Sequence, residues 1–123
     1  MLSERGAFSG FSADDIGRAR TFYADVLGVE LTEENGMLNL ALAGGQRVLI
    51  YPKDDHEPAS FTVLNFEVPD IDAAVEELSG RGVSFEHYEG AGQDDRGIAR
   101  EYGPPIAWFK DPAGNILALI QTG

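Results

Sequence analysis

Two histidines, His56 and His87, are the residues of this chain best suited to acid–base chemistry, because an imidazole titrates near neutral pH. They are not spaced as a metal-ligand pair of the HxxxH type. His56 lies in an acidic stretch, residues 54–57, where we expect a solvated loop residue. His87 lies in an apparent strand, residues 83–88, where it is either a structural or surface residue or a general base.

Several other catalytic groups are missing from the sequence. There is no cysteine, which excludes disulfides, thiolate metal sites and cysteine nucleophiles. The polar, glycine-rich segment 89–97 lacks the lysine and hydroxyl residue of a phosphate-binding loop, so we interpret it as an exposed loop or a lid. No G-x-S-x-G motif marks a serine nucleophile. We therefore expect no cofactor.

Length and charge limit the function classes further. The chain has 123 residues, 43% of them hydrophobic, which suits one folded domain over residues 1–123. No apolar run is long enough for a membrane span, so a cytoplasmic location is expected. The net charge of −12 repels nucleic acid and anionic membranes and could favour a cationic ligand.

An internal repeat organises the elements that would position these groups. Residues 8–16 are echoed by residues 63–71. Each copy is a strand followed by an aspartate, Asp15 or Asp70, placed to cap a helix. Apolar residues then recur at helical spacing in both copies, which predicts two amphipathic helices.

Both predicted helices stop at a glycine, Gly28 in the first copy and Gly82 in the second, where a left-handed C-terminal cap is expected. Strand signals follow each helix. The sequence therefore predicts an α+β fold of two tandem βαβββ modules, the first over about residues 6–53 and the second over about residues 60–121.

The first module contains a predicted hairpin. Residues 44–45 are both glycine, a two-residue turn signal. Such a turn places Leu40 opposite Leu49 and Asn39 opposite Ile50. The leucine-rich face should pack on the helix, which leaves Asn39 and Ile50 on the other face of the sheet.

The second module contains a hairpin with a different loop. Residues 111–115, DPAGN, suit a three-residue loop that ends in a glycine bulge, which places Trp108 opposite Ala118. Alternation along residues 63–68 turns Glu67 away from the helix. Glu67 is interpreted either as a carboxylate in water or a salt bridge, or as a functional group facing a cavity.

The paired modules resemble the vicinal oxygen chelate superfamily, which includes glyoxalases, bleomycin-resistance proteins and extradiol dioxygenases. The resemblance rests on the helix opening, aromatic pair and Leu-Gly stop of residues 15–28, on the repeat, and on residues 108–117, WFKDPAGNIL. It implies that the two sheets curl into a cup. In the metal enzymes of the superfamily, four His, Glu or Gln side chains in that cup hold a divalent cation.

Carried over to this sequence, the four ligand positions fall at Phe8, Ile50, Val63 and Ala118, and none of these side chains can bind a metal. Shifting each position by two residues, which keeps the strand face, adds only one polar side chain, Asn65. The resemblance therefore implies a member that lacks the metal site, and it argues against glyoxalase-type isomerisation and extradiol ring cleavage.

The function expected is metal-independent binding of a small, aromatic or cationic molecule in the cup. Trp108 and Phe8 would form an aromatic wall or else fill the space of the metal, and Glu67 would face the same cavity. The predicted ligand-binding residues are Phe8, Asn39, Ile50, Val63, Asn65, Glu67, Trp108 and Ala118.

Two alternatives stay open. One is a lyase, isomerase or dioxygenase of the same superfamily that uses Glu67 or His87 as acid or base, and the other is a metal site placed elsewhere. A homodimer is also expected, because two short modules leave strand edges that tend to be covered. The cup could then lie within one chain or be shared between two.

Overall fold

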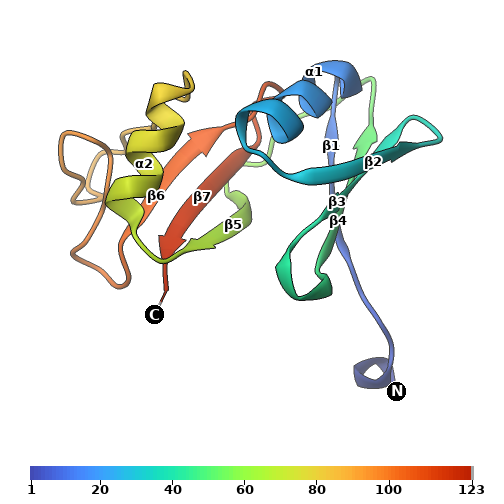
Figure 1. The fold of residues 1–123 in the computed structure, drawn as a ribbon, viewed down its shortest axis with the longest axis horizontal. Coiled ribbons are helices and arrows are strands. Elements are labelled where there is room, and N and C mark those ends of the chain that lie inside the picture. The colour runs from blue at the N-terminus through green and yellow to red at the C-terminus, as the bar shows by residue number, and fades with distance from the viewer. Residues whose placement is uncertain (123) are drawn as a thin grey trace. The chain divides into compact units, whose positions relative to one another are not determined.

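The computed structural model describes residues 1–122 of the chain. It divides them into two compact units, unit 1 (Met1–Glu57) and unit 2 (from Pro58 onward) (Figure 1). Among these residues, no helix is both long and apolar enough to cross a membrane.

Unit 1 contains a four-stranded sheet with one helix. The strands have the order β1-β4-β3-β2; β1 runs parallel to β4, and the other pairs are antiparallel. The predicted βαβββ succession is confirmed here. The elements are a 3-10 turn (Leu2–Glu4), β1 (Ser9–Ala13), α1 (Ile16–Thr21), a π-helical turn (Phe22–Val26), β2 (Glu30–Glu34), β3 (Met37–Ala41), a 3-10 turn (Ala43–Gly45) and β4 (Arg47–Pro52).

The helical segment made of α1 and the π-helical turn after it begins and ends where the sequence predicts. The Asp15 carboxylate accepts a hydrogen bond from the Arg18 N–H at 3.1 Å, which satisfies a free donor of the first turn. At the other end Gly28 adopts a φ of 69°, a left-handed conformation that a side chain disfavours. The following Val29 N–H donates to the Tyr23 carbonyl at 2.8 Å and closes the helix.

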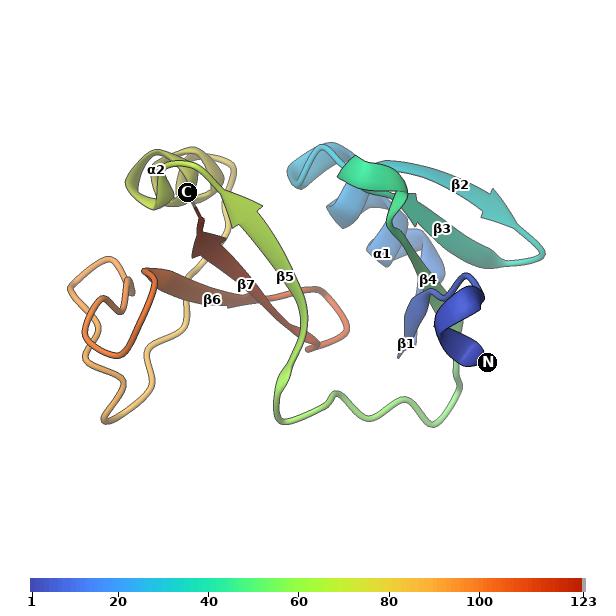
Figure 2. The ribbon, with the colours of Figure 1, turned by 90° about the horizontal axis from the view of Figure 1, so that it is seen from below.

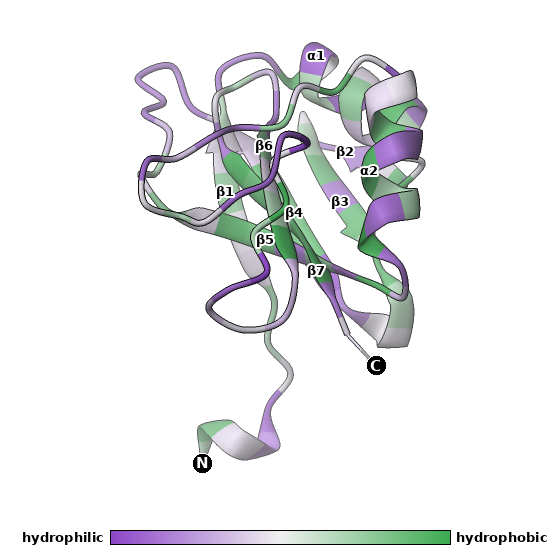
Figure 3. Cartoon of the chain, turned by 90° about the vertical axis from the view of Figure 1, so that its left-hand side faces the viewer, coloured by the Kyte–Doolittle hydropathy of each residue, from purple (hydrophilic) through white to green (hydrophobic). Residues whose placement is uncertain are grey.

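Unit 2 contains a three-stranded sheet, order β5-β7-β6, and one helix that stands to one side of it (Figure 2). Helix α2 is capped by Asp70, whose carboxylate accepts from the Ala73 N–H at 3.1 Å, and the chain leaves it through Gly82 at a φ of 94°. It is banded green and purple in Figure 3, as expected of a helix with one apolar stripe. The elements are β5 (Thr62–Val68), α2 (Ile71–Gly80), β6 (Ile106–Lys110) and β7 (Ile116–Gln121).

The strand predicted over residues 83–88 is wrong. Only one isolated bridge remains there, between Phe85 and Phe109. The segment is instead a loop. Its Glu86 N–H donates to the Trp108 carbonyl of β6 at 2.8 Å, and several other backbone groups bond to one side chain. The Gln93 carboxamide accepts from the Tyr88 N–H at 2.6 Å, and it donates to the carbonyls of Glu86 and Gly97, each at 2.8 Å. Backbone groups satisfied in this way have no need of a neighbouring strand.

The register of the first hairpin differs by one residue from the prediction. Leu40 pairs with Val48, and Leu38 pairs with Ile50. The turn is not the two-residue kind: three residues, Ala43–Gly45, form a 3-10 turn that is closed by the Leu42 N–H donating to the Gln46 carbonyl at 2.9 Å. One extra turn residue shifts the pairing by one, which moves every side chain of β4 to the other face.

The second hairpin is confirmed. Trp108 pairs with Ala118, and the loop 111–115 has Gly114 at a φ of 83°. Its aspartate decides the geometry, because the buried Asp111 carboxylate accepts from the backbone N–H groups of Ala113 and Asn115, both at 2.9 Å. An aspartate that bonds to the backbone two and four residues ahead fixes a turn by local chemistry alone.

Candidate functional site

Each sheet has one face toward the helix of its unit and one face turned away from it, which we call the distal face. In unit 1 the helix side is marked by Phe11, whose ring lies 6.4 Å from that of Tyr23, and by Glu33, which pairs with Arg20 at 3.7 Å. Residues one step along each strand therefore form the distal face. They are Phe8, Gly10, Ser12, Glu30, Thr32, Glu34, Met37, Asn39, Ala41, Arg47, Leu49 and Tyr51.

Ile50 is not on this distal face. It pairs with Leu38 and Phe11 and is 0% exposed, so it belongs to the core under α1. The prediction that Ile50 shares a face with Asn39 is therefore wrong, for the reason of register given above. Asn39 itself is half-buried and does lie on the distal face, beside Leu49.

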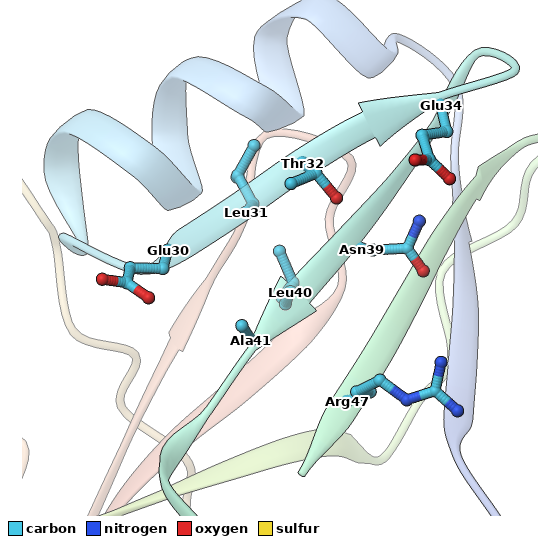
Figure 4. A pocket seen from close by; sticks show the side chains of 8 residues that line it. All are labelled: Glu30, Leu31, Thr32, Glu34, Asn39, Leu40, Ala41 and Arg47. Atoms are coloured by element: carbon cyan, nitrogen blue, oxygen red, sulfur yellow. The ribbon is translucent and has the colours of Figure 1, made fainter. Parts of the chain in front are cut away.

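A hollow of about 570 Å³ lies on the distal face of unit 1, over β2, β3 and the start of β4 (Figure 4). Alternation places two carboxylates, a hydroxyl, a carboxamide and a guanidinium around it, and of these only Asn39 was singled out from the sequence. The lining residues are Glu30, Leu31, Thr32, Glu34, Asn39, Leu40, Ala41 and Arg47.

Phe8 lies next to this hollow. It precedes β1, is 57% exposed, and carries the Arg47 guanidinium over its ring at 5.0 Å from the centroid. A cation over an aromatic face is attracted by the ring quadrupole. No sequence pattern predicts this pair, because β4 brings Arg47 beside Phe8 from far along the chain.

His56 is not the solvated residue that was expected. Its Nδ1 and the Ser12 Oγ are 2.6 Å apart and share a hydrogen bond, and both residues are half-buried. The turn that carries His56 folds back on the end of β1, where the Lys53 N–H donates to the Ala13 carbonyl at 3.0 Å. This hydroxyl–imidazole pair was missed because the two residues lie far apart in sequence.

In unit 2 the helix side is identified by Gln121, whose side-chain oxygen accepts from the Ile71 N–H at the start of α2, at 3.0 Å. Side chains one step from Gln121 therefore belong to the distal face. Two cross-strand rows cover that face: Asn65, Ala118 and Trp108 in the first, and Glu67, Ile120 and Ile106 in the second. The predicted alternation that turns Glu67 from the helix is thus confirmed.

Trp108 has an aromatic partner that the sequence did not suggest. The Tyr88 ring meets it edge-on, with centroids 5.5 Å apart and planes at 74°, a favoured geometry for two rings. Burial, and then the Glu86 carboxylate, raise the pKa of Tyr88, so its phenol stays protonated and neutral at physiological pH. Glu86 in turn pairs with Lys110 at 3.6 Å.

Two further predicted residues have less defined positions. Val63 has no register partner, because the pairing of β5 with β7 shifts between Thr62 and Leu64; a residue at such a bulge is not assigned to a face by alternation. His87, the weaker catalytic candidate, is exposed in the loop after α2. The roles of these residues, and those of Asn65, Glu67, Trp108 and Ala118, stay predictions.

The metal site of the vicinal oxygen chelate enzymes does not fit these side chains. Phe8, Ile50, Val63 and Ala118 carry no donor atom, and moving the β4 position by one residue onto the distal face brings Leu49 or Tyr51, of which only Tyr51 carries an oxygen. In the part of the chain that the structure describes, no three His, Asp or Glu side chains are grouped to hold a metal ion.

Solved structures with the same fold come from several bacteria. The antibiotic-binding protein TnmS3 of Streptomyces sp. CB03234 is 23% identical, with 97% of this chain and 98% of that chain covered and a TM-score of 0.69. A glyoxalase family protein of Enterococcus faecalis is 25% identical, with coverages of 98% and 99% and a TM-score of 0.71. The fosfomycin resistance protein FosX of Mesorhizobium loti is 15% identical, with coverages of 98% and 93% and a TM-score of 0.66.

None of the curated proteins matches the sequence. A family model does match, over residues 9–119. The match spans both units and all the strands from β1 to β7, apart from the last two residues of β7. This chain therefore belongs to the Glyoxalase/Bleomycin resistance protein/Dioxygenase superfamily.

Proposed function

We propose that the protein binds a small, flat, cationic or amine-bearing molecule without a metal, and that the distal face of unit 2 supplies the recognition. The observation that carries this proposal is the Trp108–Tyr88 aromatic pair on the same sheet as the exposed Glu67 and Asn65. Aromatic surface with a few fixed polar groups is typical of small-molecule sites.

The spacing of this face suits a planar ligand. Asn65 and Trp108 are separated by one strand, which corresponds to about 10 Å between their backbones. The residue between them, Ala118, is 0% exposed, so the accessible side chains of this row are those at its two ends. A flat ligand can contact the half-buried Trp108 ring with one edge and the exposed Asn65 amide and Glu67 carboxylate with another.

Charge and ring contacts set the preference. Aromatic faces attract cations, with a contribution of roughly 0.5–2 kcal/mol per contact. The Glu67 carboxylate offers a charge-assisted hydrogen bond to an amine, although its exposure limits the gain. The net charge of −12 acts in the same direction. An anionic ligand has neither the cation–aromatic attraction nor the charge-assisted hydrogen bond to Glu67, and the net negative charge repels it.

The family comparisons support small-molecule binding in a general way, because one structure of similar fold is an antibiotic-binding protein and another a fosfomycin resistance protein. Metal independence is supported by the donor-free side chains at the family's ligand positions. Elemental analysis that finds about one zinc, nickel, iron or manganese ion per chain would overturn this part of the proposal.

Titration with two dyes tests the recognition. Acridine orange is a planar cation, and 8-anilinonaphthalene-1-sulfonate is a comparable anion. We expect the cation to bind more tightly, and we expect Trp108→Ala and Glu67→Gln each to weaken it about tenfold. Glu76→Gln, on the exposed side of α2, is the matched control and should change nothing. Tighter binding of the anion, or no loss in either variant, would refute the proposal.

We also propose that the protein is a homodimer. In both sheets the outer strands hydrogen-bond to another strand on one side only, and β1 is such a strand in unit 1. Open edges tend to be covered, and twofold pairing is the commonest way to do so. Sedimentation at tens of micromolar should give the mass of two chains; the mass of one would contradict the proposal.

A further inference from the structure

The hollow of unit 1 has opposite charges on its two sides. Glu30, Ala41 and Arg47 form a single cross-strand row, with the carboxylate on β2, a methyl group on β3 and the guanidinium on β4. The two charged residues are thus two strand spacings apart, about 10 Å between backbones. Thr32 and Asn39 form the next row, so a hydroxyl and an amide group lie beside the line that joins the two charges.

Glu30 and Arg47 do not neutralise each other. The Arg47 guanidinium lies over the Phe8 ring, 5.0 Å from the ring centroid. Figure 4 shows the Arg47 side chain extending away from Glu30. Within residues 1–122, no ion pair joins Arg47, Glu30 or Glu34 to an opposite charge. The neighbouring Glu33, which faces α1, pairs with Arg20.

We propose that this hollow binds a zwitterionic small molecule, with its ammonium group against Glu30 and its carboxylate against Arg47. A carboxylate matches the planar fork of a guanidinium, which can donate two parallel N–H bonds to it. An ammonium group can donate to the Glu30 carboxylate and to the hydroxyl of Thr32, two residues along the same face of β2. The volume of about 570 Å³ admits a ligand of this size.

The charge pattern excludes simpler ligands. A monocation meets Glu30 but leaves Arg47 without an anion, and a monoanion meets Arg47 but leaves Glu30 without a cation. Only a ligand with both charges, separated far enough to reach both sides, interacts favourably with the whole lining. This site uses none of the residues of the aromatic face in unit 2, so the inference goes beyond the function proposed above.

The test uses 6-aminohexanoate as probe, with hexylamine and hexanoate as the matched single charges and 3-aminopropanoate as the short zwitterion. Binding is followed by NMR through the Asn39 side-chain amide. We expect a saturable shift with 6-aminohexanoate and a Kd at least about threefold lower than for each of the other three compounds, since exposed ion pairs are individually weak.

Variants separate the site from general electrostatic attraction. Arg47→Gln should remove the advantage of 6-aminohexanoate over hexylamine, and Glu30→Gln should remove its advantage over hexanoate. Glu33→Gln, in the same strand but facing α1, is the control and should leave the Kd unchanged. The proposal is refuted if hexylamine binds as tightly as the zwitterion, if Glu33→Gln weakens binding equally, or if Asn39 shows no saturable shift.

Discussion

The two distal faces come from one repeated module and yet have different chemistry. In unit 1 the strand after the helix, β2, is retained, and it adds Glu30, Thr32 and Glu34 to a polar hollow. In unit 2 the corresponding strand is replaced by a loop, which instead adds Tyr88 to an aromatic surface around Trp108. The helix sides of the two sheets are alike because both must pack against a helix. The chemistry of the distal faces differs because the element that follows the helix differs between the two units.

The largest expected effect tests the equivalence of the two helix sides. Leu38 in unit 1 and Phe109 in unit 2 are both 0% exposed. Phe109→Ala should lower the free energy of unfolding by about 3–5 kcal/mol and Leu38→Ala by about 2–5 kcal/mol, because each leaves a cavity. Urea denaturation measures both values. Phe61→Ala, at a side chain 68% exposed, is the control; a core variant that changes stability no more than this control would break the equivalence.

The next effect distinguishes the two hairpin turns. Asp111→Ala should lower the free energy of unfolding by about 2–3 kcal/mol. The substitution leaves the part-buried N–H of Ala113 and the buried N–H of Asn115 without an acceptor. The turn Ala43–Gly45 has no side-chain cap of this kind. Thermal unfolding of Asp111→Ala beside Asp54→Ala, an exposed aspartate, checks the value. Equal stability of the two variants would show that the loop needs no such anchor.

A smaller effect should follow from Gln93→Ala, which tests how unit 2 builds its aromatic surface. The side chain hydrogen-bonds to the backbone of Glu86, Tyr88 and Gly97. Its removal should therefore lower the free energy of unfolding by about 1–2 kcal/mol. Tyr88 would then no longer be held against Trp108, and the tryptophan emission should shift to longer wavelength. Gln46→Ala, at an exposed position in unit 1, should leave the emission unchanged. An unshifted spectrum in Gln93→Ala would mean that the ring contact alone holds Tyr88.

The smallest effect concerns pH. Burial acts to raise the pKa of Asp94, but the N–H groups of Ile98 and Arg96 and the nearby Arg100 outweigh it and hold the pKa below its ordinary value. A lowered pKa in the folded state stabilises the protein fully above the ordinary value near 4, and this contribution is lost as the pH falls through the folded pKa.

Asp94→Asn should therefore destabilise the protein at pH 6 by less than about 1 kcal/mol, because the group is exposed. The difference from the original chain should shrink as denaturation is repeated at lower pH, toward about pH 3. Asp54→Asn serves as the control in the same series. A difference that stays constant with pH would contradict this role of Asp94.

The candidate site was predictable only in part. On β5, β6 and β7, local signals sufficed: the turn chemistry of residues 111–115 fixed the pairing of Trp108 with Ala118, and alternation then placed Glu67 correctly. On β4 the same reasoning failed, because Val48, Leu49 and Ile50 are all apolar and alternation cannot tell which set is buried. A turn longer by one residue was enough to exchange the faces.

Residue types and their spacing were enough to predict the local order of the molecule: two repeated modules, helices capped by Asp15 and Asp70, and helix ends at Gly28 and Gly82. These features depend on interactions within a few residues of chain, so residue types and spacing specify them. Three features depend instead on tertiary packing: the face of β4 that is buried, the absence of a strand over residues 83–88, and contacts between segments distant in sequence. Those contacts are Arg47 on Phe8, His56 with Ser12, and Tyr88 on Trp108. Each depends on which side of a sheet becomes buried, and packing against the helix, rather than any local pattern, settles that choice.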